Sequence, residues 1–192
     1  MNFLAHAYLS FNNPQTLTGN MMGDFVKGKQ KDLFPEGIKR GIELHRFIDS
    51  FTDAHPVVYE AKKAFKSVVG RYAGAFVDIS FDYFLANDIK EKTAEEWEIF
   101  AQDAYAILEN QQQYFPERFA RLFPYMREHD WLYNYRFEWG IENSFSNIIR
   151  RAKYLSIDKT IVFAVFQQNI VLLKESYDAF FPDLKNAVKN KL

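Results

Sequence analysis

The sequence predicts an all-α fold in which residues 1–192 form a single domain. Apolar residues recur mostly at spacings of three and four, which is the pattern of helices that bury one face. Six prolines and eight glycines are few for this length, so few positions would interrupt a helix. No segment shows the alternation of apolar and polar residues that is typical of strands. With 192 residues, 48% of them hydrophobic, the chain can fill one core but is short for two.

Local patterns predict individual helices along the chain. Over 57–69, valine, alanine and phenylalanine residues share one side with lysines opposite, which predicts an amphipathic helix. Thr93 followed by Glu96 indicates a capping box for a helix that should end near Gln111. Pro116 is expected to begin a helix through Arg127. Four other helices are expected. One begins near Glu36, two cover 73–87 and 143–154, and a long last one runs from 156 or 158 to 181.

Composition excludes several classes of protein. The formal net charge is −1, from 24 basic and 25 acidic side chains, so no global field attracts nucleic acid or an anionic membrane. The absence of cysteine excludes disulfides, thiolate zinc sites and cysteine nucleophiles, and suits a reducing compartment. The start of the chain lacks the features of a secretory signal, and no apolar run approaches the roughly 20 residues of a membrane helix. We therefore expect a cytoplasmic protein that binds neither nucleic acid nor membranes.

Two pairs of polar residues fall on helix faces that are otherwise apolar. His45 and Asp49 are four residues apart, and so are Asp78 and Asp82, so each pair is stacked one turn apart. A carboxylate on an apolar helix is costly unless it is paired, hydrogen-bonded or bound to metal, and two stacked carboxylates favour a cation. Alternatively, Asp49 simply satisfies a buried His45. For Asp78 and Asp82 the alternatives are an arginine partner, such as Arg46 or Arg71, or a role for one aspartate as an exposed helix cap.

Two further residues strengthen the case for a metal site. His6 lies in an apolar stretch, and Asp24 follows Gly19 and Gly23, which allow a close backbone approach. Each alone could be a core histidine or a turn cap. Together the four sites offer imidazole and carboxylate ligands suited to Mn²⁺, Mg²⁺ or Fe²⁺ and, less exclusively, Zn²⁺. Such a cluster could activate a water and neutralise phosphate charge, as phosphodiester hydrolysis requires.

Four blocks of sequence resemble the acyl carrier protein phosphodiesterase family. They are MNFLAHAYLS, GNMMGDFVKG, GIELHRFIDSFTDAHP and DISFDYFLA, in the order and approximate spacing of that family, with HDWLYNYR at 129–136 as the best later match. The resemblance implies a helical bundle related to the His-Asp (HD-domain) phosphohydrolases and a manganese-dependent site. It also implies hydrolysis of the phosphodiester between 4′-phosphopantetheine and a serine of acyl carrier protein, an activity connected with fatty acid biosynthesis.

The resemblance also assigns roles to residues. It implies a metal and water cluster of His6, Asp24, His45, Asp49 and Asp82, with Asp78 close to it. We expect His6, Asp24, His45 and Asp82 as metal ligands, and Asp49, Asp53, Arg46 and Asp78 as catalytic residues. In this hypothesis Asp49 or Asp53 takes a proton from the attacking water, and Arg46 or Lys27 holds a phosphate oxygen. The chain departs from the pattern in lacking an adjacent His-Asp pair and in having Tyr83 where a histidine often stands.

Carrier proteins of this kind are acidic, so the docking surface should be basic. Lys27, Lys29 and Lys31 beside Asp24 are the preferred candidates, and a second basic cluster at 150–153 is better read as a solvated face. Two alternatives stay open at this stage. The chain could be a metal-dependent phosphohydrolase acting on a nucleotide or another small phosphodiester, or a non-catalytic helical binding module whose polar residues satisfy one another.

Overall fold

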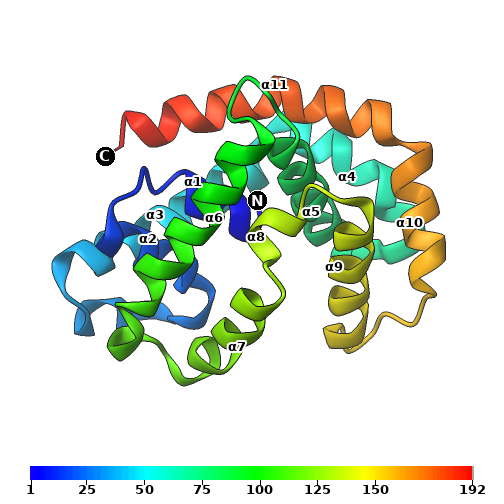
Figure 1. Cartoon of the computed structure of the whole chain (residues 1–192). Coiled ribbons are helices and arrows are strands. Elements are labelled where there is room, and N and C mark those ends of the chain that lie inside the picture. The colour runs from blue at the N-terminus through cyan, green and yellow to red at the C-terminus, as the bar shows by residue number, and fades with distance from the viewer. Residues whose placement is uncertain (192) are drawn as a thin grey trace.

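The computed structural model describes residues 1–191, and this part of the chain contains helices and short 3₁₀ turns but no strand (Figure 1). The all-α prediction is therefore confirmed. The α-helices are α1 (Phe3–Tyr8), α2 (Pro14–Met21), α3 (Glu36–Ala54), α4 (Pro56–Val69), α5 (Ala73–Ala86), α6 (Ala94–Glu109), α7 (Glu117–Glu128), α8 (Trp131–Asn134), α9 (Glu138–Arg151), α10 (Lys159–Gln168) and α11 (Ile170–Lys189). The 3₁₀ turns are η1 (Gly23–Phe25), η2 (Gly28–Leu33), η3 (Gly70–Tyr72) and η4 (Gln112–Tyr114).

Several helix boundaries follow the sequence signals closely. The predicted capping box at the start of α6 is present, with Thr93 Oγ1 accepting from the Glu96 N–H at 3.3 Å. In return, the Glu96 carboxylate accepts from the Thr93 N–H at 2.7 Å. Pro56 begins α4, where the missing N–H of proline costs nothing.

Two of the predicted helices differ from the structure. α9 covers Glu138–Arg151, so it begins and ends earlier than the expected 143–154. Gly140 in its first turn lets the backbone pack against α8, where a Cβ would lie 2.0 Å from the Asn134 oxygen. The expected long last helix is two helices that meet at Asn169. There the Asn169 side chain donates to the Val165 oxygen at 2.8 Å, and its backbone N–H donates to the same oxygen at 3.1 Å, so Asn169 caps the last turn of α10. α11 also continues past Pro182 to Lys189.

Glycines allow α2 and α3 to cross at backbone contact. A Cβ on Gly19 would lie 2.0 Å from the Ile38 oxygen, and one on Gly41 would lie 2.3 Å from the Thr16 oxygen. Side chains of any size at these positions would force the two helices apart. The crossing brings the end of α2 against the middle of α3, where the residues of the candidate site lie.

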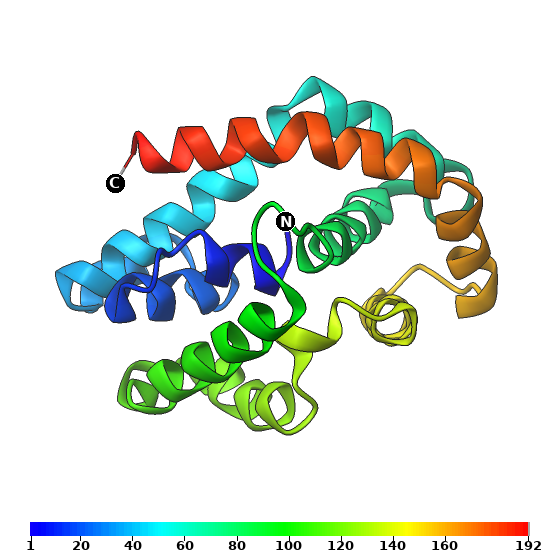
Figure 2. The ribbon, with the colours of Figure 1, turned by 45° about the horizontal axis from the view of Figure 1, so that its top comes forward.

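One continuous apolar core joins the helices around α5. α5 is buried on most sides, between α1 and α4 and beneath α11, which runs along α3, α4 and α5 (Figure 2). α1 packs against both α2 and α5, so His6 is held in the interior from two directions. Among residues 1–191 no helix is both long and apolar enough to cross a membrane.

Candidate metal-binding site

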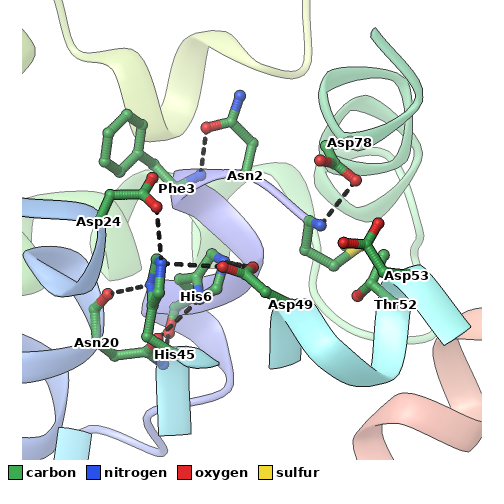
Figure 3. Close-up of a pocket in the computed structure, with 11 residues that line it drawn as sticks. Asn2, Phe3, His6, Asn20, Asp24, His45, Asp49, Thr52, Asp53 and Asp78 are labelled. Carbon is green, nitrogen blue, oxygen red and sulfur yellow. Dashed lines mark hydrogen bonds and ion pairs between the residues drawn. The ribbon is translucent and has the colours of Figure 1, made fainter. Parts of the chain in front are cut away.

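Residues from α1, η1, α3 and α5 meet at a cavity of about 220 Å³ (Figure 3). Six of the residues singled out in the sequence line it: His6, Asp24, His45, Asp49, Asp53 and Asp78. They come from segments up to about seventy positions apart, so the fold, not local sequence, brings them together.

His6 and His45 form the centre of the site with Asp49. The two imidazole rings are stacked, with centroids 4.2 Å apart and planes inclined by 23°. The Asp49 carboxylate spans both rings, since Oδ1 lies 3.3 Å from His6 Nε2 and Oδ2 lies 3.2 Å from His45 Nε2. Asp24 Oδ1 lies 3.2 Å from the same atom, His45 Nε2. Both histidines are buried, whereas Asp24 and Asp49 are open to solvent.

Asn20 orients both histidines. Its Nδ2 donates to the His6 backbone oxygen at 2.7 Å and to Ser10 Oγ at 3.0 Å, which fixes which side of the amide carries the oxygen. That Oδ1 therefore accepts from His6 Nδ1–H at 2.7 Å. The backbone oxygen of Asn20 accepts from His45 Nδ1–H at 2.8 Å. Neutral forms of both rings then carry their free lone pair on Nε2, which faces the carboxylates.

Gly23 makes room for the His45 ring. A Cβ on Gly23 would lie 2.3 Å from His45 Cγ, closer than any side chain tolerates. The glycine also precedes Asp24 in η1, so the same turn supports the ring and delivers the carboxylate. The sequence signal for this arrangement is the pair Gly19 and Gly23 on either side of Asn20.

The electrostatics of the cluster favour positive charge at its centre. Burial opposes charge on His45, but the hydrogen bonds to Asp24 and Asp49 outweigh it and raise the pKa of His45 to about 9. Burial and the neighbouring His45 lower the pKa of His6. Burial opposes charge on Asp49 as well, yet its bonds to the two histidines lower the pKa of Asp49 strongly. The hydrogen bond with His45 lowers the pKa of Asp24.

The donor atoms fit a divalent cation. Both Nδ1 atoms donate to Asn20, so in neutral imidazoles the lone pairs lie on Nε2 and point at carboxylate oxygens. Lone pairs and carboxylate oxygens repel one another unless a proton or a cation lies between them. Ligand atoms of His6, His45 and Asp49 all lie within 4.8 Å of one another. Two imidazole nitrogens and carboxylate oxygens form a donor set that suits Mn²⁺, Fe²⁺ or Zn²⁺. Asp24, whose Oδ1 contacts His45 Nε2, offers a further carboxylate to such an ion.

Asp82, expected as a ligand, lies apart from this cluster. It is fully buried, and its oxygens accept from the backbone N–H groups of Asn2 at 3.1 Å and Leu4 at 2.8 Å. It therefore satisfies otherwise unpaired donors at the start of α1. Burial raises the pKa of Asp82 to about 7, against the opposing influence of the Met1 amino group and those N–H groups. The structure places Asp82 where it anchors the helix that carries His6.

Asp78 and Asp53 line the cavity on the side away from Asp24. Asp78 Oδ1 bonds the Met1 amino group at 2.9 Å, and burial raises the pKa of this carboxyl despite the positive partner. Asp53 is exposed and pairs with Lys62 at 2.7 Å. Both carboxyl groups thus face the cavity without touching the two histidines (Figure 3).

Arg46 lies outside the cavity. Its guanidinium donates to the backbone oxygens of Val26 and Gly28, each at 3.0 Å. It therefore holds the segment between η1 and η2 against α3, next to Asp24. The structure gives Arg46 this anchoring contact and does not bring it to the place where a phosphate would meet the histidines.

The three lysines of the expected docking surface differ in their surroundings. Lys27 and Lys29 are exposed on the segment that follows Asp24. Lys31 is ion-paired with Glu43 and lies 3.8 Å from Asp32, so its charge is largely compensated. Lys27 and Lys29 have no ion pair within residues 1–191, so they supply free positive charge on the segment after Asp24.

Asn20 and Gly23 were not identified as site residues from the sequence. The signal for Asn20 was a polar residue between apolar methionines and glycines, but its effect depends on the crossing of α2 and α3. Asn2 and Phe3, which also line the cavity, gave no signal because short polar and aromatic residues are common near a helix start.

Comparisons with known proteins agree with the resemblance seen in the four blocks. A family model described as acyl carrier protein phosphodiesterase matches residues 1–184. A relative from Photorhabdus laumondii with that name is 30% identical over 192 residues, 100% of this chain and 96% of the relative. A relative of the same name from Escherichia coli strain K12 / DH10B is 33% identical over 156 residues, 79% of each chain. No solved structure is a significant match.

Proposed function

Because this chain belongs to the acyl carrier protein phosphodiesterase family, we propose that it removes 4′-phosphopantetheine from holo acyl carrier protein. In the proposed reaction a water oxygen bonds to phosphorus while the bond from phosphorus to the carrier's serine oxygen breaks. The serine oxygen gains a proton, and the products are apo carrier protein and 4′-phosphopantetheine. The observation that carries this proposal is the convergence of His6 Nε2 and His45 Nε2 on Asp49 in an open cavity.

The proposal includes a divalent cation, with manganese as the expected ion. His6, His45 and Asp49 would hold it, and Asp24 is placed to join them because its Oδ1 lies beside His45 Nε2. Such an ion, when bound, would neutralise phosphate charge and acidify a water. The hydrogen bonds from both Nδ1 atoms to Asn20 support this assignment, because they keep each Nε2 free for a ligand bond.

The remaining acids supply proton transfer in the proposed reaction. Asp49 is engaged by both histidines, so it is poorly placed to accept another proton. Asp53 lines the same cavity and is open to solvent, and only its Oδ1 is paired with Lys62, so its Oδ2 could take a proton from the attacking water and pass it to bulk solvent. We therefore assign the general base to Asp53 in place of Asp49.

Acyl carrier protein is the proposed partner, and Lys27 and Lys29 are its proposed contacts. Their uncompensated charges lie on the segment after Asp24, where an acidic carrier could dock with its serine-linked phosphate at the cavity. A cytoplasmic location is part of the same proposal, supported by a sequence without cysteine.

A mass measurement tests the function directly. Holo carrier protein is incubated with the enzyme and Mn²⁺, with and without a chelator, and the mass of the carrier is followed. The proposal predicts loss of the phosphopantetheine mass only when metal is available. An unchanged carrier together with turnover of a nucleotide or another small phosphodiester would contradict it. In the same assay, reversing charge with K27E/K29E should raise KM, whereas K189E on α11 should leave KM unchanged.

A further inference from the structure

A second, larger cavity lies beside the candidate metal site. It is a groove of about 920 Å³ with walls from α7, α8 and α9. α7 and α9 lie on either side of α8, next to the N-terminus of the chain (Figure 1). Asn2 and Phe3 line both this groove and the cavity that contains His6 and His45. The two spaces therefore share a wall, and Asn2 and Phe3 stand at the edge of the histidine cluster (Figure 3).

We propose that this groove binds the pantetheine arm of the holo carrier protein, an inference that rests on the proposed function. The scissile phosphodiester has the carrier's serine on one side and the arm on the other. With the phosphate at His6 and His45, the arm has to leave the metal cavity past one of its walls. The wall formed by Asn2 and Phe3 leads directly into the groove.

The chemistry of the groove matches that of the arm. Beyond its phosphate the arm is uncharged, with two amides, a hydroxyl group and a pair of methyl groups before the sulfur. Amide and hydroxyl side chains that can bond such groups line the groove, together with indole rings that can pack on the methyl groups: Asn134, Asn143, Asn147, Ser144, Trp131 and Trp139. Its volume also falls within the roughly 300–1,000 Å³ of sites for small molecules.

The charges along the groove favour an uncharged ligand over the acidic body of the carrier. Glu128 and Asp130 line it as well as Arg150 and Arg151, so both signs are present. The two arginines bond to Asn147, through its Oδ1 and its backbone oxygen, each at 3.1 Å. Attraction of a strongly acidic protein surface by Arg150 and Arg151 would be offset by repulsion from Glu128 and Asp130, so the groove has no net charge that selects such a surface.

Asn143 offers a variant that fills the groove without disturbing the core. It is exposed on α9 and lines the groove, so N143W should place an indole where the arm lies. N186W is the matched control, because Asn186 is an exposed asparagine of α11 that lines neither cavity. Circular dichroism of both variants checks that the helices form.

Calorimetric titration with free pantetheine measures the subsite independently of catalysis. We expect the wild type and N186W to bind with Kd on the order of 0.1–1 mM, as for a small neutral ligand. N143W should bind about tenfold more weakly or worse. It should also lower kcat/KM for holo carrier protein by about tenfold, whereas N186W should leave kcat/KM unchanged.

The outcomes separate this inference from the proposed function. Equal binding of pantetheine by the wild type and N143W, or no binding by the wild type, would overturn the assignment of the groove. A different outcome is that the wild type binds pantetheine, N143W does not, and the wild type leaves holo carrier protein intact. This outcome would support the assignment of the groove and refute the proposed reaction.

Discussion

The side chain of Asn20 makes two hydrogen bonds with His6, one with the imidazole Nδ1 and one with the backbone oxygen, each 2.7 Å long. The backbone oxygen of the same residue accepts from His45 Nδ1. One residue of α2 thus fixes the position and tautomer of His6 and supports the tautomer of His45. Partners of this kind orient the ligands of a metal ion and so influence metal affinity.

Replacing Asn20 by alanine should therefore weaken metal binding. N20A removes the acceptor for His6 Nδ1–H, so the ring can rotate and shift its proton to Nε2. We expect about 10- to 100-fold weaker Mn²⁺ binding, measured by calorimetry. S10A is the matched control, because it removes the Ser10 contact of Asn20 but leaves both bonds to His6. Equal affinities for N20A and S10A would show that Asn20 does not orient the site.

Gly23 should tolerate no side chain. In G23A the new Cβ would overlap the His45 ring, so the ring or η1 has to move. We expect a loss of about 1–3 kcal/mol in the free energy of unfolding, measured with urea, together with weaker metal binding. G74A is the control, since a Cβ at Gly74 meets only the flexible end of Lys62 at 3.3 Å. A G23A protein as stable and as metal-competent as G74A would contradict the close packing of Gly23 on His45.

Metal binding should release a proton near neutral pH. The pKa of His45 lies above its ordinary 6.5, at about 9, so without metal the ring is protonated through neutral pH. A ligand imidazole must be neutral, so affinity should fall by about tenfold for each pH unit below 9. Calorimetry at pH 7.5 in buffers of different ionisation enthalpy measures the released proton. D24N should reduce the release, because Asp24 helps to raise the pKa of His45. If the wild type released no proton on binding metal, the prediction would be contradicted.

Asp82 should matter for stability more than for metal binding. D82A leaves the backbone N–H groups of Asn2 and Leu4 without their buried acceptor. We expect the free energy of unfolding to fall by about 2–4 kcal/mol, and D82N to lose less because it keeps one acceptor oxygen. Urea unfolding and Mn²⁺ titration of the folded variants measure both effects. A D82N protein that is stable but binds no metal would restore Asp82 to the ligand set.

The helices were predictable because their signals are local. Thr93 and Glu96 lie three residues apart and cap α6 as their spacing predicts. The convergence of His6, Asp24, His45 and Asp49 could also be anticipated, because each is a polar residue in an apolar or glycine-rich setting. The break at Asn169 was not evident, since apolar periodicity continues through it and only one side-chain hydrogen bond marks it.

The roles of individual acids depend on distant partners and could not be read from sequence. A buried carboxylate such as Asp82 has the same signature whether it binds metal or accepts from backbone N–H groups, and here the donors lie some eighty positions away. Arg46 next to His45 suggested phosphate binding, but it is directed to the backbone of Val26 and Gly28. Only the crossing of α2 and α3 shows that Asn20 supports both histidines.

The most direct test of the account is to detect the histidine nitrogens bound to Mn²⁺. Pulsed electron paramagnetic resonance of the protein with bound Mn²⁺ reports ¹⁴N couplings from imidazoles coordinated to the ion. The account predicts couplings from both His6 and His45, with one set lost in H6Q and the other in H45Q. Bound Mn²⁺ without any nitrogen coupling, or couplings that survive in both variants, would contradict it.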